Sequence, residues 1–124
     1  MREIELVRKA SVDGKPVGLS MLKVIDGSVG YVFYIAVARG FRRMKVGSRL
    51  LDDALDWFRS KGVKEVFAAA EEDNLESIGL FTSKGFARTG YGSLAKKYGR
   101  IQALLMYRKM LVVPGEILMS AALA

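Results

Sequence analysis

The sequence predicts a domain of the α/β (α+β) class, and three observations lead to that prediction. Alternating apolar and polar residues separated by turn-forming pairs indicate strands at about 3–10, 16–26 and 30–38. The apolar period then changes to that of an amphipathic helix over about 46–61. Another apolar run at 63–70 completes a strand–helix–strand unit, which predicts a right-handed parallel crossover.

Single residues mark the turns and ends of these elements. Asp13-Gly14 and Asp26-Gly27 supply the two turns that separate the first three strands. The third strand is apolar on both faces, which predicts a central position in the sheet. In the helix, apolar side chains recur at helical spacing, and Gly62 ends it. The recurring positions are Val46, Leu50, Ala54 and Phe58.

The second half of the chain predicts a further helix and two further strands. Asp73-Asn-Leu-Glu76 resembles a capping box that opens a helix over about 75–84. Strand patterns follow near 86–91 and 102–111. Residues 110–124 are too apolar for an exposed tail, so we expect them to pack on the domain or at a subunit interface. Because no repeat or linker interrupts the pattern, we expect the 124 residues to form a single domain.

The composition excludes several kinds of active site. The chain has no cysteine and no histidine, which rules out a thiolate nucleophile, a serine–histidine–acid triad and a His- or Cys-ligated metal. A catalyst built here must use carboxylate, tyrosine, lysine, backbone or water, and we expect no metal. The N-terminus lacks the continuous apolar run of a signal peptide, and no segment approaches the roughly 20 apolar residues that span a bilayer. We therefore expect a cytoplasmic protein without a membrane partner.

The net charge of +7 is unevenly distributed along the chain. Residues 39–49 and 84–109 carry basic side chains and no acid, whereas residues 52–76 carry eight acids against three bases. Such clustering attracts anions to part of the surface. A nucleotide-like cofactor, a nucleic acid or an acidic protein would each fit this pattern, and charge alone does not choose among them.

The segment from Ile35 to Leu51 narrows that choice. An apolar strand runs directly into five cationic residues and then into an amphipathic helix. The N–H groups of a helix N-terminus lack intrahelical partners, and the helix dipole adds positive potential there. This arrangement predicts a phosphate-binding loop for a phosphorylated cofactor.

Two blocks of sequence resemble the GNAT superfamily of acetyl-CoA-dependent N-acetyltransferases. Residues 37–51 resemble its pyrophosphate loop, Arg/Gln-x-x-Gly-x-Gly/Ala. Residues 74–86 resemble its Asn-x-x-Ala-x-x-Leu-Tyr-x-x-x-Gly-Phe helix. The resemblance implies a mixed, mostly antiparallel sheet in which a central parallel strand pair, at about 30–38 and 63–70, splays apart. It further implies helices at about 46–61 and 75–84 that flank this sheet.

The resemblance also implies a cofactor and a reaction. A primary amine, on a protein or a small molecule, would attack the thioester of acetyl-CoA directly, without a protein nucleophile. The pantetheine arm would enter the gap between the splayed strands, and the pyrophosphate would bind N–H groups of the loop. The cofactor-binding residues expected on this basis are Ile35, Ala36, Val37, Arg42, Arg43, Met44, Lys45, Val46, Gly47, Ser48, Asn74 and Phe81.

Several positions depart from the family pattern. Lys45 replaces the first glycine of the loop, and Phe81 stands where the family usually has a tyrosine that protonates the leaving thiolate. Carboxylate bases used by some members would fall on Ala69 or Tyr31. The usual acid and base are therefore missing. The replacements that we expect are Glu71 or Glu72 as the base and Tyr91 or Tyr98 as the acid.

These departures leave two other functions open. One is an acyl-CoA-binding or regulatory module without catalysis, and the other is a basic nucleic-acid-binding protein. Nucleic acid is not the partner that we expect, since no nucleic-acid motif accompanies the basic residues. The resemblance begins at the family's second strand, so the first strand and the two helices that wall the acceptor site have no counterpart. We therefore expect an open acceptor side, which favours a protein acceptor or a groove completed by a partner such as a homodimer.

Overall fold

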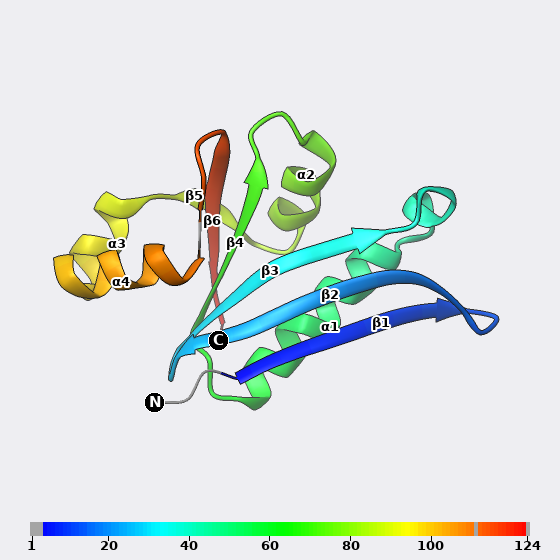
Figure 1. Cartoon of the computed structure of the whole chain (residues 1–124), viewed down its shortest axis with the longest axis horizontal. Helices are drawn as coiled ribbons and strands as arrows, with labels where there is room; N and C mark the ends of the chain where they lie inside the picture. The colour runs from blue at the N-terminus through cyan, green and yellow to red at the C-terminus, as the bar shows by residue number, and fades with distance from the viewer. Residues whose placement is uncertain (1–3, 111, 124) are drawn as a thin grey trace.

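The centre of the fold is a six-stranded sheet with the order β1-β2-β3-β4-β6-β5 (Figure 1). It is seen in a computed structural model that describes residues 4–110 and 112–123. Strands β3 and β4 are parallel, and the other neighbouring strands are antiparallel. The predicted mixed, mostly antiparallel sheet is thereby confirmed. The strands are β1 (Ile4–Val12), β2 (Lys15–Asp26), β3 (Val29–Val37), β4 (Glu65–Glu71), β5 (Ala87–Thr89) and β6 (Glu116–Ala122).

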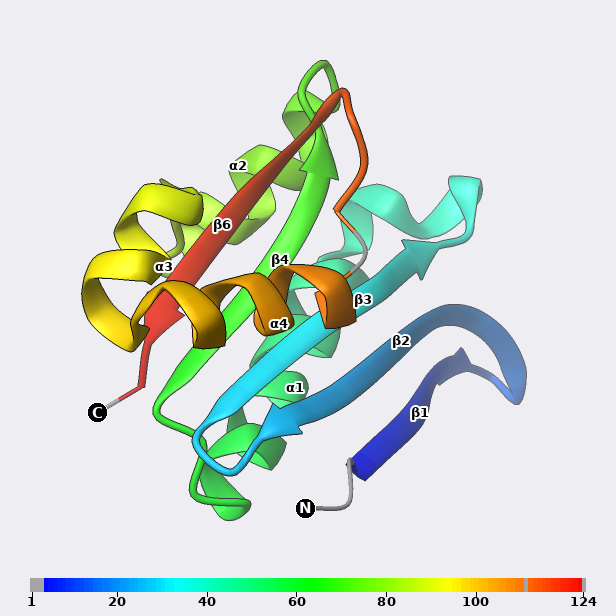
Figure 2. The ribbon, with the colours of Figure 1, turned by 60° about the vertical axis from the view of Figure 1, so that its left-hand side comes forward.

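Helices lie on both faces of the sheet. Helix α1 runs behind β1, β2 and β3, whereas α4 crosses in front of β3 and β4 (Figure 2). The sheet separates two apolar cores, one on each face, and successive residues of a strand contact them alternately. Val32 and Val66 belong to the core beneath α1 and α2, while Tyr31 and Phe67 belong to the core beneath α3 and α4. The helices are η1, a 3-10 helix (Arg39–Met44), α1 (Val46–Ser60), α2 (Leu75–Ser83), α3 (Tyr91–Tyr98) and α4 (Arg100–Met110).

The predicted central strands and flanking helices are confirmed, with ends that differ by one or two residues. The strand expected at 86–91 is shorter, because β5 ends at Thr89 and Tyr91 already begins α3. The strand expected at 102–111 is wrong. That segment forms α4, whose buried residues Ala103, Met106 and Met110 follow helical spacing.

The apolar C-terminal segment supplies β6. This strand pairs with β4 along its whole length, from Glu65 opposite Ala122 to Glu71 opposite Glu116. On its other side it pairs with β5. Residues 116–122 thus lie inside the sheet, in the position beside β4. Residues 111 and 124 of this segment lie outside the described residues.

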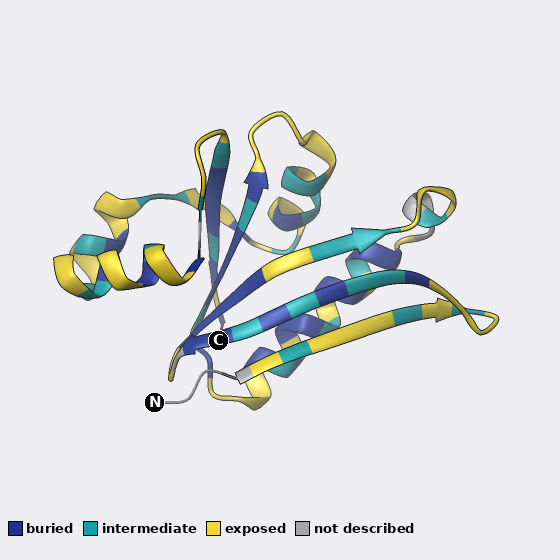
Figure 3. Ribbon diagram, in the orientation of Figure 1, coloured by how far each residue is buried: buried dark blue, intermediate teal, exposed yellow. Residues whose placement is uncertain are grey.

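The sheet face opposite α1 is covered only in part. Side chains of α3 and α4 pack over Tyr31, Phe67 and Leu118. Over β1, β2 and the carboxyl half of β3, no helix within residues 4–110 covers this face, and much of β1 is exposed (Figure 3). Helices α3 and α4 thus occupy only the part of this face next to β4. No helix among the described residues is long and apolar enough to cross a membrane.

Candidate active site in the cleft between β3 and β4

The parallel pair β3–β4 is joined over only half of its length. Val29 to Val32 pair with Glu65 to Ala68, and no residue described beyond Val32 pairs with β4. A bulge lies at the point of separation. Val32 pairs with Leu22 and Tyr34 pairs with Met21, which leaves Phe33 as the additional residue in β3. Because a bulge bends its strand, β3 turns away from β4, and the predicted splay is confirmed (Figure 1).

A cavity of about 430 Å³ occupies the gap that this separation opens. Its wall is formed by the end of β3, the beginning of α1 and the first turns of α2. The expected cofactor residues that line it come from all three elements. The lining residues are Ile35, Ala36, Val37, Lys45, Gly47, Ser48, Asn74, Glu76, Ser77 and Leu80.

The beginning of α1 presents N–H groups to this cavity. The first hydrogen bond of the helix runs from the Arg49 N–H to the Lys45 carbonyl oxygen, at 3.1 Å. The N–H groups of the three residues before Arg49 therefore have no partner within the helix. No side chain caps this end, and no acidic residue lies in the first turn. The helix dipole thus leaves a site that favours an anion.

Lys45 and Gly47 shape this end of the cleft. Lys45 adopts the left-handed conformation, with φ 59° and ψ 23°, although a glycine would do so with less strain. A Cβ added to Gly47 would lie 3.3 Å from Leu80 Cδ2 and 3.6 Å from Val37 Cγ2. A longer side chain at position 47 would therefore enter the space between α1, α2 and β3.

Asn74 closes the other end of the cavity and caps α2. Its Oδ1 accepts a hydrogen bond from the Ser77 N–H at 3.1 Å, so Asn74 rather than Asp73 is the N-cap. The predicted capping box is wrong by one residue. Glu76 is thereby released from a capping role and lines the cavity instead.

Sequence reasoning missed three residues of the cavity wall, namely Glu76, Ser77 and Leu80. With the N-cap at Asn74, all three fall on the side of α2 that faces β3, since residues three and four apart share a helix face. The signal for them was present in the sequence, but it depended on the correct N-cap.

Some expected cofactor residues lie elsewhere. Phe81 is only 2% exposed, and in the core its ring centroid lies 5.2 Å from the ring centroid of Phe86. Val46 is buried against Val17 and Leu50. Neither residue is part of the cavity wall. The side chains of Arg42, Arg43 and Met44 lie outside the described part of the structure.

Glu71 and Glu72 lie where β4 ends. They line a second groove of about 350 Å³ together with Asp73 and residues 113–116. The Glu72 N–H donates to the Gly115 carbonyl oxygen at 2.9 Å, which ties the end of β4 to the turn before β6. Because Asn74 follows directly, this groove adjoins the cleft. Within the described residues no group of three or more acidic side chains forms a metal site.

Neither of the two tyrosines considered as acids lines this groove. The Tyr98 hydroxyl donates to the carboxylate of Glu65, which also has Lys97 Nζ at 3.1 Å. Glu65 begins β4 and Glu71 ends it, so six residue steps of about 3.3 Å, or roughly 20 Å, separate them. Tyr98 therefore anchors α3 at the wrong end of β4 for a role beside Glu71.

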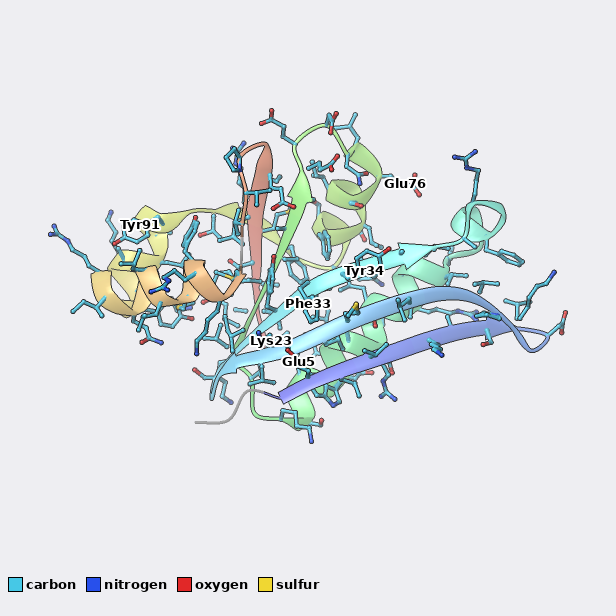
Figure 4. All side chains as sticks on the ribbon, in the orientation of Figure 1. Glu5, Lys23, Phe33, Tyr34, Glu76 and Tyr91 are labelled. Carbon is cyan, nitrogen blue, oxygen red and sulfur yellow. The ribbon has the colours of Figure 1, made fainter. Side chains whose placement is uncertain are left out.

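Tyr91 lines neither the cavity nor the acidic groove. Its hydroxyl donates to the Arg100 carbonyl oxygen at 3.2 Å, and its ring packs against Tyr107. In Figure 4, Tyr91 lies on the opposite side of β4 and β6 from Glu76. The structure thus places Glu71 and Glu72 in a groove next to the cleft, and neither tyrosine lines the cleft or this groove.

Comparison with known proteins identifies the family. Residues 2–86 match the model of the Acetyltransferase (GNAT) family. A mycothiol acetyltransferase of Stackebrandtia nassauensis is 29% identical over 86 residues. The match covers 67% of this chain but 28% of that protein, so the chain spans less than a third of this curated relative.

Solved structures share the fold. The PaiA N-acetyltransferase of Thermoplasma acidophilum, solved with coenzyme A, gives a TM-score of 0.74 at 16% identity, over 96% of this chain and 61% of that one. The ribosomal-protein-S18-alanine N-acetyltransferase of Escherichia coli gives 0.72 at 18% identity, over 97% and 70%. Together with the family model, which matches well over half of its residues, these findings show that the chain belongs to the GNAT acetyltransferase family.

Proposed function

We propose that this domain binds acetyl-CoA in the cleft between β3 and β4 and transfers the acetyl group to a primary amine. The observation that carries the proposal is the cavity itself. It opens where β3 leaves β4, it has at one end the first N–H groups of α1, which lack partners within that helix, and the carboxylates at the end of β4 lie beyond its other end. A phosphorylated donor and an amine acceptor would meet between these two ends.

The residues of the cavity suit an extended donor with a diphosphate. The N–H groups of Val46, Gly47 and Ser48 would hold the diphosphate, and the Lys45 ammonium would add a positive charge beside it. The backbone of Ile35 and Ala36, which has no partner in β4, would pair with the amide groups of the pantetheine arm. Asn74 uses its Oδ1 for capping, and its amide N–H groups remain available as donors.

Acetyl-CoA supplies an activated acetyl thioester when it is bound. The protein then has to hold the amine uncharged and in line with the thioester carbon, and much of the rate can come from that positioning. Glu71 or Glu72, directly or through water, would accept the proton of the incoming ammonium. As the C–N bond forms and the C–S bond breaks, the sulfur leaves as a thiolate, and the second proton of the attacking nitrogen passes to this thiolate to give free coenzyme A. A thiol has a pKa near 8.5, so its thiolate leaves without a tyrosine acid.

The acceptor end of the cleft is acidic, which supports a cationic acceptor. Glu71, Glu72, Asp73 and Glu116 line one groove there. An ammonium group would be attracted to this groove before it loses its proton. A protein terminus, a lysine side chain or a small amine would satisfy this chemistry. We also expect the protein to act in the cytoplasm, because a donor with several phosphate charges does not cross membranes.

Titration calorimetry with acetyl-CoA and with coenzyme A tests donor binding. The wild type is expected to release heat and to gain thermal stability with either ligand. Gly47→Glu should abolish both effects, because it places a carboxylate in the diphosphate site. Gly92→Glu is the matched control, since a Cβ at Gly92 meets nothing within 4 Å and the residue lies in α3, outside the cleft. Circular dichroism verifies that both variants are folded.

Two outcomes would contradict the proposal. Equal binding by wild type and Gly47→Glu would mean that the diphosphate does not bind at the beginning of α1. Donor binding without acetylation of any amine in a broad panel would mean that the domain binds acyl-CoA but does not transfer the acyl group.

A further inference from the structure

Within the described residues, strand β1 lies at one edge of the sheet and pairs with β2 alone (Figure 1). The ladder with β2 is regular from Ile4 to Ala10 and shifts at Ser11. An exposed strand with a regular ladder presents a row of backbone donors and acceptors that another strand can pair with. The midpoint of the regular segment is Val7.

The side chains of β1 differ between its two faces. Leu6 packs on the core beneath α1, and Arg8 Nε lies 3.1 Å from Asp53 of that helix. Glu5, Val7 and Lys9 alternate with them and therefore lie on the uncovered face. Val7 is 53% exposed. A negative, an apolar and a positive side chain thus follow one another along the uncovered face, where the Glu5 carboxylate also lies 3.6 Å from Lys23 Nζ of β2.

This order is complementary to itself. A two-fold axis through Val7, perpendicular to the sheet, would place a second copy of β1 antiparallel to the first. Glu5 of each copy would then face Lys9 of the other, and the two Val7 side chains would meet. An axis through Arg8 would oppose two arginines, and an axis through Leu6 would place Glu5 opposite Val7. The register centred on Val7 therefore matches charges and also uses the whole regular ladder.

Apolar side chains of the neighbouring strands β2 and β3 continue from Val7 across the uncovered face. Met21 of β2 lies beside Val7, and Tyr34 of β3 lies beside Met21, so the three side chains form one apolar row across the uncovered face. Tyr34 is 49% exposed, and Figure 4 shows Phe33 and Tyr34 on this side of β3. At the edge the row stops at Val7, whereas in the paired arrangement it would continue into the second copy.

From these features we propose that the partner of the β1 edge is a second copy of this chain, paired antiparallel along residues 4–10. The two six-stranded sheets would become one continuous sheet, with both α1 helices on the same face. The cleft between β3 and β4 lies beyond β2 and remains accessible in both copies. The proposal therefore does not depend on whether the cleft binds acetyl-CoA.

A disulfide experiment reports the register directly, because the chain has no cysteine of its own. In the proposed dimer the two Val7 Cα atoms are about 4.5–5.5 Å apart, which suits a disulfide. The two Lys9 Cα atoms are more than about 13 Å apart along the strands, beyond the reach of one. Under mild oxidation Val7→Cys should form a covalent dimer on a non-reducing gel, and Lys9→Cys should remain monomeric. Equal cross-linking of the two variants, or none in Val7→Cys, would overturn the proposal.

Charge exchange provides a second, independent measurement. Sedimentation at increasing protein concentration should give the wild type twice the 13.7 kDa mass of the single chain. Lys9→Glu and Glu5→Lys should each shift the protein to monomer, because like charges would face each other. The double variant should return to dimer. Lys64→Glu, an exposed lysine outside β1, should leave the dimer unchanged. A monomeric wild type, or a double variant no more dimeric than the single ones, would refute the paired edge.

Discussion

The two halves of the β3–β4 pair differ in construction and in use. The first half is joined by the ladder from Val29 to Val32 and is buried on both faces. In the second half the strands separate, the residues of β3 become exposed or half-buried, and a cavity takes the place of the missing pairs. The paired half holds β3 against β4, and the separated half leaves the Ile35 and Ala36 backbone without a partner in β4. The paired residues Val29 to Val32 therefore position the cleft, although none of them lines it.

The largest effect is expected in the separated half, at the carboxylates of β4. Replacing Glu71 and Glu72 together by Gln should lower kcat by at least about 100-fold at neutral pH, since a general base contributes about 10² to 10⁴ in rate. The pH–rate profile should also lose its acidic limb. Asp56→Asn, on the exposed face of α1, serves as the control. An unaltered profile in the double variant would remove both residues from the mechanism.

The joined half should respond to Gly30→Ala with a large loss of stability. A Cβ at this position would lie 2.5 Å from Phe58 Cε1, and the Phe58 ring is completely buried. We expect the free energy of unfolding to fall by about 3 kcal/mol, as measured by urea denaturation. Gly79→Ala, where a Cβ meets nothing within 4 Å in α2, should be neutral or slightly stabilising. Equal stability of Gly30→Ala and wild type would mean that Phe58 does not pack closely on β3.

Tyr31 in the same half should make stability depend on alkaline pH. Burial, and secondarily the charge of Glu116, raises the pKa of Tyr31 from 10.0 to about 12. The folded state therefore retains a proton that the unfolded state loses, and stability falls as pH rises from 10 to 12. The loss attributable to this group reaches about 3 kcal/mol. Unfolding measured in this range should show a smaller decline in Tyr31→Phe than in wild type, and parallel curves would contradict the assignment.

The smallest effect is expected beneath α1, at Ser20. Its hydroxyl is fully buried and has no hydrogen-bond partner among the described residues. Ser20→Ala removes this unsatisfied group and should raise the free energy of unfolding by about 1 kcal/mol. Ser60→Ala is the matched control, because the Ser60 hydroxyl donates to the Trp57 carbonyl oxygen on the surface. A loss of stability in Ser20→Ala would indicate an interaction of this hydroxyl that the account lacks.

The elements that bury a regular set of side chains could be predicted from the sequence. The strands β2, β3 and β4 and the helix α1 follow from residue spacing, because each buries a regular set of side chains. The splay of β3 from β4 came from family resemblance, and its physical cause is the bulge at Phe33, which no pattern in the sequence marked.

Three features could not be predicted from the sequence, because they depend on how distant parts of the chain pack together. Helix α4 exposes Ile101, Leu104 and Leu105, so its apolar residues lie all around it and concealed the helical period. The position of Tyr98 depended on where α3 packs, and that was not readable from spacing. Glu76 was assigned to a cap because Asp73 and Asn74 are both good N-cap residues, and only geometry chose Asn74.

Hydrogen exchange of the backbone amides with and without coenzyme A tests the central claim most directly. We predict that the ligand slows exchange at residues 35–37, which line the separated half of the cleft, and at residues 46–48, whose N–H groups begin α1. We predict no change at residues 29–32, whose amides lie in the ladder that is already closed. Ligand protection confined to other segments, or equal protection of both halves, would contradict the account.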